Sequence, residues 1–285
     1  MTPGCDRNPT TIRIARKSTT PGGESRRARW LARLAGLMTA LLTIPAGPAA
    51  RADNPKTIET VSASVVAVGT FMRTRSPAFG FRGTGFAVGD GTLIATNAHV
   101  IPLVLDSANL ETLVVALRHA DGRIEVRRAR QVASDAEHDL ALLKIDGAAL
   151  PALRLSESDA TRVGEGFLLT GFPMGEVLGL IPVTHRAMVS ALTPIAIPSA
   201  NDRQLDPKVV QRLARGAYPV YQLDATAYPG NSGSPLYDIN TGAVVGVINL
   251  VFVKGTKEAA LSNPSGVTYA IPVKYLRALL ARQQP

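Results

Sequence analysis

The sequence predicts an all-β fold, and three observations support this. Short runs of β-branched and apolar residues recur from position 57 onwards, separated by Gly, Asp and Pro turn residues. Only two segments of this part suggest helices, at 207–215 and 272–283. Of the 285 residues, 46% are hydrophobic and 19% are charged, which suits a large buried core. Short strands at this spacing are typical of a sandwich or a barrel.

The first 52 residues are predicted to be a signal peptide. Four arginines between positions 26 and 33 precede an uncharged, largely apolar run of eleven residues at 34–44. The small-x-small pattern Ala50-Arg51-Ala52 then predicts cleavage after Ala52. The apolar run is shorter than the ~20 residues that a membrane span needs, so we expect no stable span once the leader is removed. An uncleaved anchor or a buried helix is the alternative.

The charge distribution argues against a nucleic-acid partner. The formal charge is +9, but nine Lys and Arg and only two acidic residues lie in the first 52 positions, against 22 and 20 in the remainder. The part of the chain after position 52 is therefore close to neutral and lacks the basic face of a nucleic-acid binder. Cys5 is the only cysteine and would leave with the leader, so the exported protein would have no disulfide. We expect an exported protein, periplasmic or secreted.

The expected elements follow the chain in order. Turn residues at Gly89-Asp90-Gly91 and Asp121-Gly122 predict hairpins, and 71–81 is predicted to be a loop. The last segment begins at Pro272 and carries an apolar stripe, as a helix does. The segment 150–161 is the expected seam between two halves. The expected strands are 61–70, 83–88, 92–96, 112–117, 123–132, 140–145, 166–171, 187–192, 220–223, 236–237, 243–250 and 267–271.

The stretch from Ala227 to Leu236 is the first candidate for chemistry. It contains Gly230-Asn231-Ser232-Gly233, in which a serine lies beside glycines that permit a tight turn. Such a turn brings backbone N–H groups close to the serine oxygen, as an acyl-transfer nucleophile requires. The same residues are also ordinary turn formers, so the stretch alone favours a plain loop, and a functional reading needs a histidine and a carboxylate elsewhere in the chain.

His99 is the candidate general base. It directly follows an apolar strand, at a strand end where a rigid scaffold carries functional side chains, and histidine titrates near neutral pH. A structural role for His99 is the alternative. His119, His138 and His185 resemble solvated or packing residues.

Asp139 is the candidate carboxylate that orients the histidine. It opens the apolar run Leu140–Ile145, where an acid needs a hydrogen-bonding partner. Asp135, Glu137 and Asp146 lie nearby and look solvated, but spacing alone does not exclude them.

Three motifs together resemble those of chymotrypsin-fold serine proteases. They are Thr96–Val100, His138–Leu143 and Gly230–Gly233, in the order His, Asp, Ser that this family shows. The resemblance extends from about Thr57 to Leu280 and is strongest to the bacterial HtrA-type branch. Further stretches similar to that branch are Gly171–Gly175, Gln222–Ala225 and Tyr269–Pro272.

The resemblance implies a fold and a division of the chain. It implies two packed six-stranded antiparallel β-barrels (chymotrypsin-like) with a short C-terminal helix. The N-terminal barrel would span 53–155, and the C-terminal barrel with the terminal helix would span 156–285. The site would lie in the cleft between the barrels, and no PDZ module would follow in this chain.

The resemblance also implies roles for single residues. Ser232 would be the nucleophile, His99 the general base and Asp139 the residue that holds its tautomer, while the N–H groups of Gly230 and Ser232 would form the oxyanion hole. Asn231 and Ser234 depart from the commoner residues of the family. The implied substrate-binding residues are Thr226, Asn249, Leu250, Val251 and Val267. Because Thr226 at the pocket base is uncharged, we expect small apolar P1 residues.

The function expected from these features is that of an exported serine endopeptidase acting on extended or unfolded polypeptides. No cofactor or metal is expected, and the oligomeric state is left open. The alternative is a peptide-binding or chaperone-like module with little turnover, which would not need all three side chains. An esterase is a third possibility, although position 234 is Ser rather than the second Gly of the Gly-x-Ser-x-Gly elbow.

Overall fold

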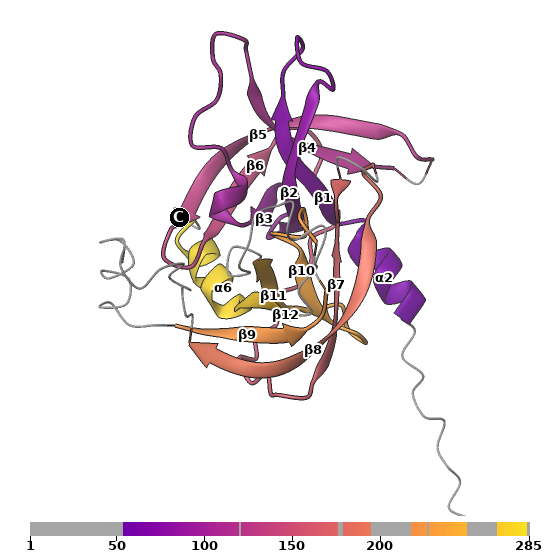
Figure 1. The fold of residues 1–285 in the computed structure, drawn as a ribbon, viewed down its shortest axis with the longest axis vertical. Coiled ribbons are helices and arrows are strands. Elements are labelled where there is room, and N and C mark those ends of the chain that lie inside the picture. Colours follow the sequence, from indigo (N-terminus) through magenta and orange to yellow (C-terminus); the bar gives the residue numbers. More distant parts are fainter. Residues whose placement is uncertain are drawn as a thin grey trace, which may run out of the picture. The chain divides into compact units, whose positions relative to one another are not determined.

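The computed structural model describes residues 54–119, 121–175, 179–194, 218–226, 228–249 and 267–283. These ranges contain two closed barrels of six antiparallel strands each, which confirms the predicted all-β class. Figure 1 shows the barrels as two groups of strands, the first in indigo to pink and the second in salmon to yellow.

Each barrel is built from strands that follow one another in sequence. The first barrel consists of β1 (Val65–Phe71), β2 (Phe79–Val88), β3 (Leu93–Thr96), β4 (Thr112–Arg118), β5 (Ile124–Asp135) and β6 (Leu140–Ile145). The second consists of β7 (Gly166–Gly171), β8 (Val183–Pro194), β9 (Pro219–Asp224), β10 (Pro235–Asp238), β11 (Val244–Asn249) and β12 (Val267–Pro272). The described helices are α2 (Asn54–Ser62), the short 3-10 helix η1 (Ala98–Val100) and α6 (Val273–Ala281).

The strand order closes each sheet on itself. Hydrogen-bonded neighbours run β1-β2-β3-β6-β5-β4 in the first barrel and β10-β11-β12-β9-β8-β7 in the second. In the first barrel, β3 pairs with β6, with Thr96 opposite Ala141. This pairing brings the end of β3 next to the start of β6, although more than 40 residues separate them in the sequence.

Many strands are buried on both faces, and the two faces belong to different hydrophobic clusters. Val66 and Val68 of β1 pack in a cluster made of first-barrel residues. Val65 and Ala67 point the other way, into a second cluster that also contains Tyr237 of the second barrel. Such strands form continuous apolar runs instead of alternating with polar residues, as the sequence shows.

The N-terminal prediction is wrong over its first residues. A strand was expected over 61–70, with strand-like sequence from Thr57, but Asn54–Ser62 is a helix and β1 begins at Val65. Pro55 favours the first turn of a helix because its missing N–H has no partner there. Val61 is then buried and Ile58 packs against the shared cluster, so tertiary packing outweighs the β propensity of these residues.

The loop predicted at 71–81 is also shorter than expected. Strand β2 begins at Phe79, because the chain continues to pair across a bulge between Val68 and Gly69. A Cβ at Gly69 would lie 2.3 Å from the carbonyl oxygen of Gly80, so this close approach of the strands requires glycine.

The other strands lie where the sequence predicts them, with ends that differ by a few residues. The strands at 140–145 and 166–171 have the predicted bounds. The C-terminal helix, expected at 272–283, spans Val273–Ala281 and buries Leu276 and Leu279. The predicted signal peptide and the helix predicted at 207–215 lie outside the described residues.

The chain between the barrels contacts both of them. The N–H of Leu153 donates to the carbonyl of Ala87 in the first barrel, at 2.8 Å. The N–H of Ser156 donates to the carbonyl of Val244 in the second, also at 2.8 Å. The connecting segment therefore holds the barrels together along its length.

Candidate active site

The serine of interest lies in a tight loop at 228–234 that leads into β10. Ser232 is 6% exposed. The N–H groups of Asn231, Gly233 and Ser234 each donate to a backbone carbonyl. Within the described ranges, the N–H groups of Gly230 and Ser232 donate to none. These two free donors are the pair that the resemblance assigns to an oxyanion hole.

The glycines of this loop cannot be replaced without distortion. Gly230 has φ +103° and Gly233 has φ +88°, both in the left-handed region that disfavours side chains. A Cβ at Gly230 would lie 2.3 Å from the carbonyl oxygen of Phe172, and one at Gly233 would lie 2.0 Å from that of Thr84. The loop is therefore fixed by sterics as well as by hydrogen bonds.

The first barrel brings His99 and Asp139 together. His99 lies in η1, which directly follows β3, and Asp139 directly precedes β6. Asp139 has φ +52°, a left-handed conformation that Asp tolerates better than most residues. Its carbonyl accepts the N–H of Ala98 and the side-chain amide of Asn97, both at 3.1 Å. These contacts stabilise the unusual backbone at Asp139.

The carboxylate of Asp139 accepts three hydrogen bonds. One oxygen accepts the backbone N–H of His99 at 2.9 Å. The other lies 2.6 Å from Nδ1 of His99 and accepts the side-chain amide of Asn249 at 2.7 Å. Because an ionised carboxylate only accepts, Nδ1 carries the proton in this contact. In a neutral His99 ring, Nε2 is then the nitrogen without a proton.

The serine loop docks on β2, the strand that pairs with β3. The N–H of Thr84 in β2 donates to the carbonyl of Ser232 at 2.9 Å. A Cβ at Gly83 would lie 3.0 Å from that carbonyl oxygen and 2.8 Å from the side chain of Val100, the neighbour of His99. The described residues contain no hydrogen bond between the Ser232 hydroxyl and His99. In proteins without substrate, catalytic hydrogen bonds are often long and tighten on binding.

The predicted competitors of Asp139 lie elsewhere, and one prediction about them is wrong. Asp135 is buried, not solvated, and its carboxylate contacts Nδ1 of His138 at 2.8 Å. Burial alone would raise the pKa of Asp135, but hydrogen bonds from the His138 ring and backbone hold that pKa below its ordinary value. The His138 ring stacks on Tyr275 of α6 at 3.9 Å between centroids. Asp135 is therefore engaged with a different histidine.

The two remaining histidines are also accounted for. His119 contacts Glu125 at 2.8 Å beside a hairpin turn. His185 lies in β8 with its ring 6.4 Å from that of Tyr228, and burial lowers the pKa of His185. Neither histidine contacts Asp139 through any hydrogen bond between described residues.

The predicted substrate-binding residues are only partly described. Thr226 is half-buried two residues after β9, and Val267 opens β12 opposite Asp224, the last residue of β9. Asn249 ends β11 fully buried, and its side chain contacts Asp139. Leu250 and Val251 lie outside the described residues.

The residues that depart from the family pattern fit the loop closely. Asn231 and Ser234 are both fully buried, and their side-chain polar atoms have no hydrogen-bond partner among the described residues. A Cβ at Gly171 would lie 2.0 Å from the Ser234 hydroxyl oxygen. The hydroxyl at position 234 is therefore accommodated by the glycine facing it.

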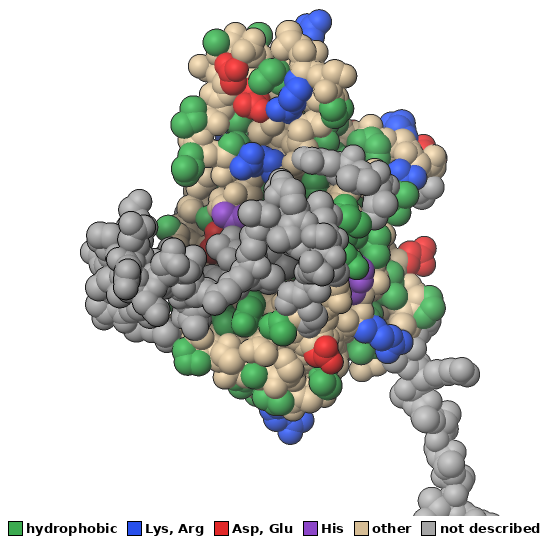
Figure 2. Space-filling view, viewed as in Figure 1, with side chains coloured by type: hydrophobic (Ala, Val, Ile, Leu, Met, Phe, Trp, Pro, Cys, Tyr) green, Lys and Arg blue, Asp and Glu red, His purple; other side chains and the backbone are tan. Residues whose placement is uncertain are grey.

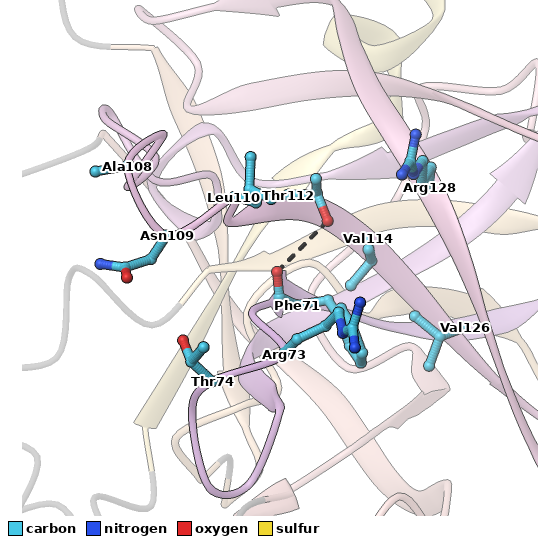
Figure 3. A pocket seen from close by; sticks show the side chains of 10 residues that line it. All are labelled: Phe71, Arg73, Thr74, Ala108, Asn109, Leu110, Thr112, Val114, Val126 and Arg128. Carbon is cyan, nitrogen blue, oxygen red and sulfur yellow. Dashed lines mark hydrogen bonds between the residues drawn. The ribbon is translucent and has the colours of Figure 1, made fainter.

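A hollow on the first barrel lacks the residues for this chemistry. A surface hollow of about 760 Å³ is lined by residues of β1, β4 and β5 and the adjoining loops, as Figure 3 shows, but these include no histidine, serine or carboxylate. The described part of the chain has no cluster of three or more metal-ligating side chains. On the face in Figure 2, the described Lys and Arg side chains are scattered instead of gathered. No described helix is long and apolar enough to cross a membrane.

Comparison with known proteins finds several curated relatives that are similar in sequence and carry the same name. The curated proteins named "Probable periplasmic serine endoprotease DegP-like" include one from Pseudomonas putida (strain W619), 29% identical over 67% of this chain and 32% of the relative. Another, from Ectopseudomonas mendocina (strain ymp), is 30% identical over 67% of this chain and 33% of the relative. The chain thus spans about a third of the length of these curated relatives.

Solved structures give the same result. An HtrA-type protease, AlgW with tripeptide, is similar with a TM-score of 0.55 at 27% identity, covering 80% of this chain and 62% of that one. Deg5 is similar with a TM-score of 0.55 at 28% identity, covering 79% and 90%. The predicted resemblance to the HtrA-type branch is therefore confirmed.

A family profile covers the part of the chain that carries all three motifs. The family described as "Trypsin-like peptidase domain" matches residues 83–247, which is more than half of the sequence. These residues include most of both barrels and the serine loop. This chain therefore belongs to the trypsin-like peptidase family.

Proposed function

We propose that this protein is an exported serine endopeptidase in which Ser232, His99 and Asp139 act together. The observation that carries the proposal is the hydrogen-bonded Asp139 carboxylate, which lies 2.6 Å from Nδ1 of His99. This contact fixes the tautomer that leaves Nε2 able to accept a proton. Family membership and the DegP-like relatives support the same reaction class.

The proposed reaction is acyl transfer to Ser232 followed by hydrolysis. The Ser232 oxygen attacks the scissile carbonyl carbon while its proton passes to Nε2 of His99. The N–H groups of Gly230 and Ser232, which have no acceptor among the described residues, stabilise the resulting oxyanion. The C–N bond then breaks as His99 donates the proton to the leaving amine. Water, activated by His99, hydrolyses the acyl-enzyme and restores the serine.

The same site has a proposed substrate preference. Thr226 lies at the expected pocket base and carries no charge, so a lysine or arginine side chain would be buried there without a partner. We therefore favour extended or unfolded polypeptides with small apolar P1 residues. Mapping the cut sites in a denatured proteome by mass spectrometry tests this preference, and predominant cleavage after Lys or Arg would refute it.

The cellular location is proposed from the leader and the relatives. Positions 1–52 have the features of a signal peptide, and the similar DegP-like proteins are named periplasmic. The protein would then act in the periplasm, or outside the cell if it is secreted further. N-terminal sequencing of the exported protein should give Asp53 as the first residue.

Casein turnover tests the activity itself. The Ser232→Ala variant should lose turnover by up to about 10⁶-fold, because the three residues act as a unit. Retention of the full rate by this variant would remove Ser232 from the mechanism. Stoichiometric binding of unfolded casein by the wild-type protein without cleavage would instead favour the peptide-binding or chaperone-like alternative.

A further inference from the structure

Thr84 is a residue of the first barrel whose polar atoms contact the serine loop, Phe172 after β7 and the strand before His99. It lies in β2 and is fully buried. Its hydroxyl donates to the carbonyl of Gly230 at 2.7 Å and accepts the N–H of Phe172 at 3.1 Å. Its backbone N–H donates to the carbonyl of Ser232 at 2.9 Å. One side chain and its backbone therefore connect the first barrel to two carbonyls of the loop.

These carbonyls control the direction of the two free N–H groups. In a trans peptide the C=O and the N–H point in opposite directions. The carbonyl of Pro229 accepts the N–H of Met174 at 2.7 Å, which leaves the N–H of Gly230 pointing the other way. The contacts from Thr84 fix the peptide planes that follow Gly230 and Ser232. The peptide group that joins Asn231 to Ser232 carries the N–H of Ser232. Because it lies between the two fixed planes, it has little freedom to rotate.

Thr84 also links the two segments that hold this loop. Phe172, whose N–H it accepts, lies two residues before Met174, whose N–H holds Pro229. The Met174 backbone has φ +49°, a left-handed conformation that needs support from its surroundings. By contacting Phe172 and Gly230 together, the Thr84 hydroxyl keeps these segments in register.

The same residue sets the position of the loop relative to the general base. The carbonyl of Thr84 accepts the hydroxyl of Thr96 at 2.7 Å. Thr96 ends β3, three residues before His99. The strand that leads to the histidine and the loop that carries the serine are thus fixed to one point in β2.

We propose that Thr84 is a positioning residue. Its hydroxyl holds the N–H groups of Gly230 and Ser232 in the orientation that binds the oxyanion. It acts through the loop and touches neither substrate nor the reacting atoms. The inference rests on the proposed function. Because the oxyanion forms only in the transition state, loss of the hydroxyl should reduce kcat and leave substrate binding unchanged.

Three variants separate this role from a general structural one. Thr84→Val keeps the shape and removes the hydroxyl, whereas Thr84→Ser keeps the hydroxyl. Thr170→Val is the matched control, because the Thr170 hydroxyl is equally buried and contacts Thr184 and Tyr237 at 2.8 and 2.7 Å, neither of which belongs to the serine loop. Rates against labelled casein give kcat and KM. Casein affinity is measured separately in a Ser232→Ala background.

Thr84→Val should lower kcat by about 10- to 100-fold, as displacement of reacting groups does, with KM and casein affinity within about 2-fold. Thr84→Ser and Thr170→Val should keep kcat close to that of the wild type. If Thr84→Val does not fold, Thr84→Cys, with its weak S–H donor, should lose kcat relative to Thr84→Ser.

If the wild-type protein is active, two results would overturn this inference and leave the proposed function standing. One is a Thr84→Val variant, or failing that a Thr84→Cys variant, with unchanged kcat. The other is an equal loss in Thr170→Val, which would show a general effect of removing buried hydroxyls. A wild-type protein without turnover would overturn the proposed function, and this inference with it.

Discussion

Asp139 is the residue on which the proposed mechanism depends most directly. Its carboxylate accepts hydrogen bonds from His99 and Asn249, while its carbonyl is held by Asn97 and Ala98. These donors come from both barrels. An Asp at this position is therefore fixed in one orientation against the imidazole, although its backbone is left-handed.

Replacing Asp139 by Asn should lower kcat by about 10⁴-fold, because an amide at this position favours the wrong tautomer of His99. Casein turnover measures the change. Asp146→Asn is the matched control, since Asp146 is exposed just beyond β6 and should be replaceable at little cost. If both variants retained the wild-type rate, or if Asp146→Asn lost more, the assignment of Asp139 would be wrong.

His185 predicts a specific effect of pH on stability. Its Nε2 atom is buried without a partner among the described residues, and burial lowers the pKa of His185 below 6.5. The unfolded chain therefore binds a proton more readily at this position than the folded protein does. The stability that the neutral ring contributes is full above pH 6.5 and decreases as the pH falls through the folded-state pKa.

The measurement is denaturant unfolding of the wild type and of His185→Leu at pH values from about 8 to about 5. The free energy of unfolding of the wild type should decrease more on acidification than that of the variant. A variant whose stability decreases as steeply as that of the wild type would contradict this role for His185.

Sequence reasoning found the candidate chemical residues but not those that hold them. His99, Asp139 and Ser232 were predicted from motifs, because local residue patterns carry them. Thr84 and Asn97 were missed, and Asn249 was assigned only to the substrate. Their roles depend on contacts between strands that are distant in sequence, such as Asn249 with Asp139, which no local pattern encodes.

At the level of elements, the strands were predicted well and the N-terminal helix was not. Strands such as β6 and β7 are short apolar runs between turn residues, so their bounds follow from the sequence. The residues of α2 include several β-branched ones, and packing of Ile58 and Val61 on the shared cluster, together with Pro55 in the first turn, explains their helical state. Burial against a distant part of the chain is not visible in a local pattern.

The helix α6 supplies a test of packing at this scale. Leu276 is fully buried against the cluster shared by the two barrels, whereas Leu280 is half-buried at its margin. Leu276→Ala should lower the free energy of unfolding by about 2–5 kcal/mol through lost burial and a residual cavity. Leu280→Ala should cost less than half as much. Equal losses in denaturant unfolding would contradict the packing described for α6.

Across the whole molecule, one hydrophobic cluster joins the barrels. It includes Phe86 and Leu140 of the first barrel, Tyr237 and Ile271 of the second, and Leu276 of α6. Neither barrel can therefore unfold without exposing apolar surface of the other. The polar contacts of Thr84 and Asn249 lie at the same junction, so the site depends on the assembly of both barrels.

This shared cluster predicts that the two barrels unfold in one transition. Far-UV circular dichroism and casein turnover should change with the same midpoint in denaturant. Tryptophan fluorescence is not a suitable probe, because the only tryptophan is Trp30, in the predicted signal peptide. Two separate transitions, one for each barrel, would contradict the prediction.

The central claim is that two barrels bring Ser232 to a histidine activated by Asp139. The most direct measurement is reaction of the folded protein with a fluorophosphonate, with the adduct located by peptide mass spectrometry. We expect one adduct per chain, on Ser232, with loss of labelling in His99→Ala. An unlabelled wild type, an adduct on another residue, or full labelling of His99→Ala would contradict the account.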